Sequence, residues 1–237
     1  SYGQTAVAKL LVDRGADLDL KNYSNNTALM YAAGKGYAEI VEYLLKNKAN
    51  VHERDNEGRT ALMVATYADC AELLLDYGAR VLELDNNGET ALFHIAERTQ
   101  DYHLETAKVL LARGALVNDI GDHNQTPLMR ATFCGNKSMC QLFIQRGADT
   151  LLRDDRDRTA RDLALERGFT NIAAMLEKAE ADQLARAPAV EADGDGDTEG
   201  LFDSVSRWLS VKKTNKSGKS IGGRSNSMFG RQPSGGS

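Results

Sequence analysis

The residues that could support catalysis or metal binding are few, and their spacing favours neither. The three cysteines, Cys70, Cys134 and Cys140, form no Cys-x-x-Cys pair of the kind that binds zinc. Cys140 falls on an apolar helix position, and Cys134 has no histidine or basic neighbour that would activate a thiol. His94 is best interpreted as a packed or solvated side chain.

Two strings in the C-terminal part resemble ligand-binding loops, but each fails at one position. Residues 217–220 (SGKS) match the end of a phosphate-binding loop, yet its first glycine is replaced by Lys213. The acidic run 193–200 offers Gly196 as the central glycine of a calcium loop, but position twelve would be Phe202 instead of a carboxylate. We therefore expect no catalytic residue, no cofactor and no metal, and we interpret the acidic run as a solvated linker.

A repeated Thr-Ala/Pro-Leu or similar step organises the part of the chain that must position any functional side chain. Its threonines are spaced by 33, 30, 36 and 33 residues: Thr27, Thr60, Thr90, Thr126 and Thr159. A second marker, usually Gly-Ala, starts 12 residues before each threonine: Gly15, Lys48, Gly78, Gly114 and Gly147. A period of about 33 residues is typical of a stacked repeat array rather than of a single globule.

Each repeat carries the pattern of two short helices. Small and apolar residues in 28–33 fit a first helix with one packed face, and Gly36 ends it. Residues 40–45 then show the i, i+1, i+4, i+5 stripe of a second helix. Helices this short are not stable alone in water, so the repeats must pack against one another.

The turn before each threonine has its own chemical signature. The residue two positions upstream is always one that tolerates a positive φ: Asn25, Gly58, Gly88, Asn124 and Asp157. We expect a tight turn there, followed by a first helix that the threonine hydroxyl caps.

With this pattern, residues 1–181 resemble the ankyrin-repeat family. The strings DNEGRTALMVA, DNNGETALF, GNKSMCQLFIQRGAD and VLLARGALVN follow its motif closely. The resemblance implies an all-α ankyrin-repeat solenoid of helix-turn-helix repeats with β-turn tips. The histidine of the motif is replaced in every repeat, so we expect its turn-bracing hydrogen bonds to be lost: Met30, Met63, Phe93, Met129 and Asp162.

The repeat frame divides the chain into an array and a tail. The array comprises a partial repeat (1–21), four full repeats (22–54, 55–84, 85–120 and 121–153) and a capping repeat (154–181). An acidic linker (182–200), a candidate amphipathic helix (201–211) and a basic, Ser/Gly-rich disordered tail (212–237) follow. The second full repeat lacks three residues near Tyr67, and the third has three extra residues around 100–103. We expect both changes to alter the binding surface locally without interrupting the stack.

The resemblance also implies a concave face, made of the turn tips and the exposed side of each first helix. The tips contribute Tyr23, Asn26, Asn56, Glu57, Arg59, Asn86, Asn87, Glu89, His123, Gln125, Arg156 and Arg158. The ends of the first helices contribute what we call the helix-end row: Lys35, Tyr67, Arg98, Phe133 and Arg167. The aromatic members favour an interface, and the arginines could recognise acidic groups of a partner.

The candidate amphipathic helix has an apolar face and is followed by lysines. That face consists of Leu201, Phe202, Val205, Trp208 and Leu209. Three functional interpretations remain open: a peptide for a partner groove, a membrane-surface anchor, or a helix that docks back on the repeats. A disordered segment with accidental periodicity is the fourth.

Composition narrows the classes of partner. The formal net charge is -5, and the repeat array is mildly acidic, which argues against general nucleic-acid binding. The absence of a cysteine framework favours a reducing, cytoplasmic setting. We expect a monomeric scaffold or adaptor that binds an unidentified protein, with no small-molecule substrate. Two alternatives stay open: a targeting region of a larger signalling enzyme or channel, and peripheral membrane association through the tail.

Overall fold

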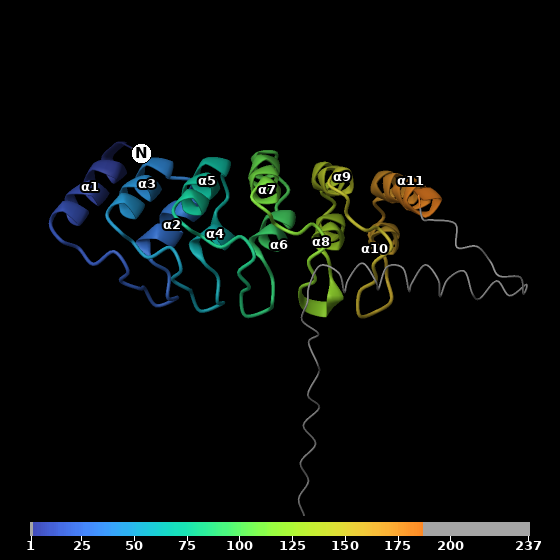
Figure 1. The fold of residues 1–237 in the computed structure, drawn as a ribbon, viewed down its shortest axis with the longest axis horizontal. Helices are drawn as coiled ribbons and strands as arrows, with labels where there is room; N and C mark the ends of the chain where they lie inside the picture. Colours follow the sequence, from blue (N-terminus) through green and yellow to red (C-terminus); the bar gives the residue numbers. More distant parts are fainter. Residues whose placement is uncertain (1, 187–237) are drawn as a thin grey trace, which may run out of the picture. The chain divides into compact units, whose positions relative to one another are not determined.

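Residues 2–186 are the part of the chain that the computed structural model describes, and they form a stack of paired helices (Figure 1). The helices are α1 (Tyr2–Asp13), α2 (Ala28–Lys35), α3 (Ala38–Lys46), α4 (Ala61–Val64), α5 (Ala68–Asp76), α6 (Ala91–Ala96), α7 (Tyr102–Ala112), the 3-10 turn η1 (Asp122–Asn124), α8 (Pro127–Phe133), α9 (Lys137–Gln145), α10 (Ala160–Glu166) and α11 (Thr170–Arg186). This arrangement confirms the all-α repeat array that the sequence predicts.

The helices fall into two layers. Neighbouring inner helices pack on one another from α2 through α4, α6 and α8 to α10, and neighbouring outer helices do so from α1 through α3, α5 and α7 to α9. In Figure 1 the outer helices follow one edge of the stack and the turn tips follow the opposite edge. A repeat therefore contacts its neighbours through both layers, as the shortness of its helices requires.

The core contains a row of equivalent side chains from successive repeats. The leucine two residues after the marker threonine is at most 2% exposed in each of the four full repeats: Leu29, Leu62, Leu92 and Leu128. In the capping repeat, Leu163 is buried two positions later in the helix. Cys140 of α9 is fully buried, as its apolar position predicts. Burial of this continuous row stabilises helices that could not form singly.

The turns have the backbone conformation that their residue types predict. Each of the five turn residues has a positive φ: Asn25 57°, Gly58 76°, Gly88 76°, Asn124 54° and Asp157 61°. Three of the threonines cap their helices by accepting a hydrogen bond from the backbone N–H three residues on: Thr27, Thr126 and Thr159. Thr90 departs from the prediction, because its buried hydroxyl has no hydrogen-bond partner in the described chain.

Backbone hydrogen bonds join neighbouring turn tips at three of the four contacts between them. The bonds are Asn56 N to Ser24 O (3.1 Å), Asn86 N to Glu57 O (3.0 Å) and Asp155 N to His123 O (3.0 Å). Within residues 2–186, the tips of the third and fourth full repeats share no such bond. The series of bonded tips is therefore interrupted once.

The two irregular repeats are connected at the turn between their helices. Helix α4 is only four residues long, and Thr66, which follows it, donates its hydroxyl to Gly34 O at 3.0 Å. Thr106 of α7 in turn donates its hydroxyl to Thr66 O at 2.9 Å. These side chains restore contact where the spacing changes, so the stack continues through both irregular repeats.

Helix α11 runs to Arg186, five residues beyond the array boundary expected at residue 181. Gln183 explains the difference: its Nε2 donates to Ala148 O at 2.6 Å, and its Oε1 accepts bonds from the backbone N–H and the hydroxyl of Thr150. The linker expected at 182–200 thus begins with helical residues. The rest of that linker, the candidate helix 201–211 and the tail 212–237 lie outside the described residues. Within residues 2–186 no helix has the length and apolar character needed to cross a bilayer.

Candidate functional site on the concave face

The structure exposes most of the residues that the sequence assigns to the concave face. Seven tip residues are exposed: Tyr23, Asn56, Glu57, Asn86, Asn87, His123 and Arg156. Four are half-buried: Asn26, Arg59, Gln125 and Arg158. In the helix-end row, Arg98 is half-buried and the other four side chains are exposed.

Glu89 is a correction, because it is 5% exposed and unavailable to a partner. The next repeat has Gly121 at the position of the turn aspartates, and a Cβ there would lie 3.0 Å from the Glu89 side chain. The missing side chain leaves room for Glu89 to fold inward. Arg130 of α8 then forms an ion pair with the buried carboxylate.

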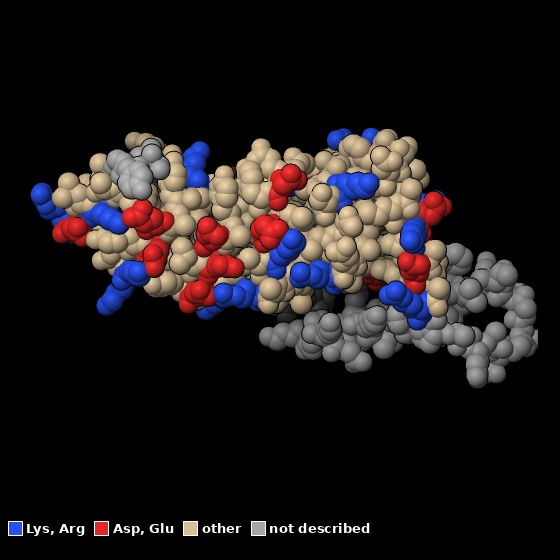
Figure 2. Space-filling view, turned by 90° about the horizontal axis from the view of Figure 1, so that it is seen from above, with Lys and Arg blue, Asp and Glu red and all other residues tan. Residues whose placement is uncertain are grey.

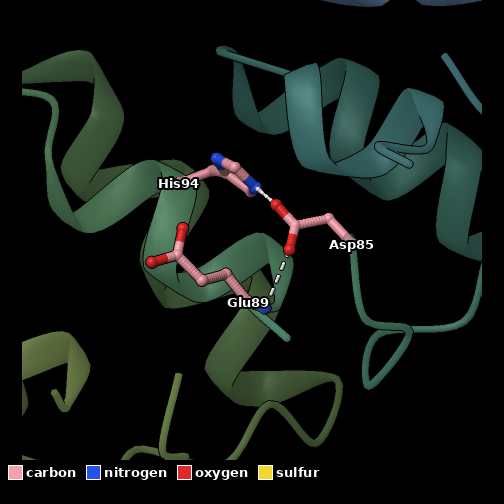
Figure 3. A group of neighbouring side chains, drawn as sticks. All are labelled: Asp85, Glu89 and His94. Carbon is pink, nitrogen blue, oxygen red and sulfur yellow. Dashed lines mark hydrogen bonds and ion pairs between the residues drawn. The ribbon is translucent and has the colours of Figure 1, made fainter. Parts of the chain in front are cut away.

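The turn aspartates hold the tips in place. Asp85 Oδ1 accepts bonds from the backbone N–H groups of Asn87 (2.8 Å) and Glu89 (2.9 Å), and Asp85 Oδ2 is 2.9 Å from His94 Nε2 (Figure 3). The expectation that these turns lose their side-chain bracing is therefore wrong for this repeat. His94, one position after the motif histidine, supplies the bond from a neighbouring place on the helix.

Two other turns are braced by arginine instead. Arg59 donates from Nε to Asp55 Oδ2, and Arg158 donates from Nε to Asp154 Oδ2, both at 2.9 Å. These arginines stand four residues after their aspartates, where the third full repeat has Glu89. Their half-buried guanidinium groups therefore stabilise the turns and are only partly available to a partner.

Asp85, Glu89 and His94 place ligand atoms within 4.8 Å of one another, as a metal site would require (Figure 3). The positive charge of Arg130 already compensates the negative charge of this group. Its guanidinium forms an ion pair with Glu89 and, through Nε at 3.2 Å, with Glu97. Buried carboxylates need such compensation. We interpret the group as a brace between the third and fourth full repeats rather than as a metal centre.

Aromatic rings connect the helix-end row to its surroundings. The Tyr67 ring stacks on Tyr102 with centroids 4.6 Å apart, and it also covers Gly36, where a Cβ would come within 2.3 Å of the ring. Farther along, the Arg167 guanidinium lies 4.3 Å from the centre of the Phe133 ring. The row is therefore preorganised by contacts between adjacent repeats.

Arg98 has an unusual environment within this row. Burial lowers the pKa of its guanidinium. His103 beside it is 5% exposed, has no hydrogen-bond partner on either ring nitrogen within the described chain, and has a pKa lowered by burial and then by Arg98. The Arg98 guanidinium thus lies beside a buried imidazole and forms no ion pair within residues 2–186, although the charge of the neighbouring Glu97 acts to raise its pKa.

The cysteines show no sign of activation. Burial raises the pKa of Cys70 and of Cys140 to about 11, and it raises the pKa of the half-buried Cys134 as well. A nucleophilic thiol needs a lowered pKa, so none of the three has the chemistry of a catalytic cysteine.

Charge on the outer helices differs from that of the helix-end row. In Figure 2 acidic side chains gather over the part of the stack from α3 to α7. The acidic residues of these three helices are Glu39, Glu42, Asp69, Glu72, Asp76 and Glu105. Most are paired with nearby lysine or arginine side chains, as is common on solvated surfaces.

Sequence reasoning missed several residues that shape this site. Tyr102 and His103 lie in the inserted segment, whose presence was visible in the 36-residue interval although its contacts were not. Arg130 was overlooked because its partners, Glu89 and Glu97, belong to the preceding repeat. Pairing across repeats leaves no mark on the motif of a single repeat.

Known proteins resemble the chain over the same region. The family model described as Ankyrin repeats (3 copies) matches residues 1–84, 47–121 and 79–154. The chain is 32% identical over 172 residues to "Transient receptor potential cation channel subfamily A member 1 homolog" of Caenorhabditis elegans, which covers 72% of the chain and 11% of that protein. It is 31% identical over 165 residues to "Probable E3 ubiquitin-protein ligase XBOS32" of Oryza sativa subsp. japonica, with coverages of 69% and 32%. It is 37% identical over 178 residues to "Alpha-latrotoxin-Lh1a" of Latrodectus hasselti, with coverages of 74% and 13%. The chain therefore spans no more than a third of the length of these relatives.

Proposed function

This chain belongs to the ankyrin-repeat family, and from that premise we propose that it binds a partner protein on its concave face without catalysing a reaction. Ankyrin repeats generally mediate protein–protein interaction. Fold alone does not choose a partner, so the proposal depends on the surface that this chain presents.

The helix-end row is the observation that carries the proposal. Tyr67 is 39% exposed and Phe133 is 41% exposed, although both are aromatic. Phe133 ends the inner helix α8, as the sequence predicts, but Tyr67 lies at the start of the outer helix α5 and not at the end of α4. Exposed aromatic side chains on a preorganised surface are typical anchors of an interface. Because adjacent repeats already fix these rings, little conformational entropy would be lost on binding.

The proposed absence of catalysis is supported by the chemistry of the candidate groups. The thiols have raised pKa values, and Asp85, Glu89 and His94 are engaged with one another or with Arg130. A general base or nucleophile would need a group that is accessible to a substrate. An activity screen with common acyl and phosphoryl substrates would contradict this part of the proposal if turnover were found.

Site-specific photo-crosslinking tests the binding surface. A photoreactive amino acid replaces Phe133 on the concave face or, as the matched control, the exposed Glu72 of the outer helix α5. The proposal predicts that cross-linked partner protein forms in cells from position 133 and little from position 72. Equal yields at both positions, or a greater yield at position 72, would show that the concave face is not the binding surface.

A second candidate function is that of a targeting region within a larger channel or ligase. Two relatives favour it. The chain covers 11% of the length of a channel homologue and 32% of the length of a probable E3 ubiquitin-protein ligase. An antibody raised against residues 22–153 can measure the mass of the natural product. A band near 25.9 kDa would count against this candidate, and a much larger band would support it.

A further inference from the structure

The helix-end row alternates between basic and aromatic side chains along the stack. Lys35, Arg98 and Arg167 stand in the first, third and capping repeats, each eight residues after the marker threonine. Tyr67 and Phe133 stand in the two repeats between them. The three basic residues thus stand at equivalent positions of stacked repeats. The aromatic rings contact these residues or their neighbours: Tyr67 covers Gly36, next to Lys35, and Phe133 lies against Arg167.

Two acidic residues next to members of this row are paired with other side chains of the molecule. Glu97 is paired with Arg130 Nε at 3.2 Å, and Glu166 accepts from Arg158 Nη1 at 2.8 Å. In contrast, no ion pair is found for Lys35, Arg98 or Arg167 within residues 2–186. The row therefore presents positive charge to a partner even though the chain as a whole has a net charge of -5.

Arg98, at the centre of the row, is where an anion would be recognised most strongly. Its guanidinium is half-buried beside Tyr102 and the buried His103, and burial lowers its pKa. A charged group that has lost part of its hydration without forming a direct ion pair gains most from an incoming carboxylate. Arg167 is exposed, and its contact with the Phe133 ring holds its planar fork in place.

The spacing of the row sets the length of the partner segment. Packed helices lie about 10 Å apart, so basic residues two repeats apart are separated by about 20 Å. An extended peptide advances about 3.3 Å per residue and would cross that distance in about six residues.

We propose that the helix-end row binds an extended acidic segment of the partner protein, with Asp or Glu at intervals of about six residues and apolar residues between them. The acidic side chains contact Lys35, Arg98 and Arg167, and the apolar ones contact Tyr67 and Phe133. This inference rests on the proposed function, since it assigns the partner chemistry to the same face.

Fluorescence anisotropy with synthetic peptides tests the inference on the whole chain. The probe is a labelled peptide of the pattern Glu-x-x-Leu-x-x-Glu-x-x-Leu-x-x-Glu, with Gly and Ser at the other positions, and the control peptide carries Lys in place of Glu. The Glu peptide should bind, and its affinity should fall as salt is added. Arg98→Gln should weaken binding by about tenfold because the lost group is partly desolvated. Arg167→Gln should weaken it by about threefold because it is exposed.

Matched variants and competing anions complete the experiment. Arg113→Gln, which removes an exposed arginine at the end of α7, should leave the affinity unchanged. Equal binding of the Lys peptide, an equal loss in Arg113→Gln, or tighter binding of a phosphoserine peptide or a single-stranded RNA would overturn the inference. If cross-linking from position 133 succeeds while the Glu peptide fails to bind, the acidic partner is wrong but the proposed function stands. Failure of both would overturn both.

Discussion

The Tyr67 ring lies almost parallel to the Tyr102 ring, with an interplanar angle of 7° and a centroid distance of 4.6 Å. Tyr67 stands at the three-residue deletion of the second full repeat, and Tyr102 stands at the three-residue insertion of the third. The two irregularities therefore meet in one contact. The extra residues of one repeat supply the ring that covers the place where the other repeat is short.

Tyr102→Ala should lower the free energy of unfolding by about 2 kcal/mol, because it removes both the stacked ring and part of its burial. Tyr77→Ala is the control: Tyr77 has a similar exposed fraction, 43% against 39%, and belongs to no aromatic pair of the described chain. We expect its effect to stay within about 0.5 kcal/mol. Urea denaturation followed by circular dichroism measures both variants, and equal effects would show that the stack contributes nothing.

Arg130→Gln should lower the free energy of unfolding by about 3 kcal/mol, because it leaves the carboxylate of Glu89 buried without its counter-ion. The double variant Glu89→Gln/Arg130→Gln should recover part of that loss, since no unpaired charge remains. The exposed pair Arg113–Asp76 provides the comparison, and Arg113→Gln should cost less than about 1 kcal/mol. A double-mutant cycle without coupling between positions 89 and 130 would contradict this account.

Lys48→Gly should raise the free energy of unfolding by about 1 kcal/mol. Lys48 has a φ of 70°, a left-handed conformation that the other four closing positions fill with glycine. Gly114→Ala is the converse, since Gly114 has a φ of 97° and open space where a Cβ would stand. It should lower the free energy of unfolding through backbone strain alone. Thermal unfolding should show a higher midpoint temperature for Lys48→Gly and a lower one for Gly114→Ala than for the wild type. An unchanged midpoint for Lys48→Gly would show that the backbone at Lys48 is not strained.

Acid should destabilise the fold through His103. Its folded pKa is lowered from 6.5, so the unfolded chain binds a proton on this ring at a pH where the folded chain does not. The contribution is constant above a pH of about 6.5 and is lost as the pH falls below that value. The free energy of unfolding of His103→Leu should therefore fall less than that of the wild type between pH 7.5 and pH 5, roughly. Parallel pH profiles would show that His103 titrates normally.

Gln183→Ala should lower the free energy of unfolding by about 2 kcal/mol, because the hydroxyl and N–H of the buried Thr150 and the carbonyl of Ala148 lose their partner. The control is Lys178→Ala, an exposed position on the same helix. Chemical denaturation compares the two. Equal denaturation midpoints for the two variants would indicate that the Gln183 side chain does not contribute to the packing of α11 on the preceding repeat.

Much of the scaffold could be predicted from the sequence because its determinants are local. Asn25 and Asp157 were identified as turn residues by type, and each has the positive φ that this role requires. The threonine caps at Thr27 and Thr126 follow from the same local chemistry. Spacing alone placed Cys140 in the core.

The remaining details depend on contacts between repeats. Glu89 was expected at the surface because the family resemblance places the residue before each marker threonine at a turn tip, and its burial depends on the missing side chain of Gly121 in the next repeat. The extension of α11 follows from the bonds of Gln183 to a loop more than thirty residues away in sequence. No motif of a single repeat contains that information.

The missing bond between the third and fourth turn tips has a mechanical consequence. At the other end of the same junction, Asn136 Nδ2 donates to Arg98 O at 2.7 Å, and midway the Arg130 guanidinium bridges to Glu89. The junction is thus fastened at one end and in the middle but free at its tips. The repeats on either side of this junction are therefore joined through the Asn136 bond and the Arg130 ion pair, but not through a backbone hydrogen bond between their tips. We therefore expect the distance between these two tips to be the one that changes most easily when a partner binds.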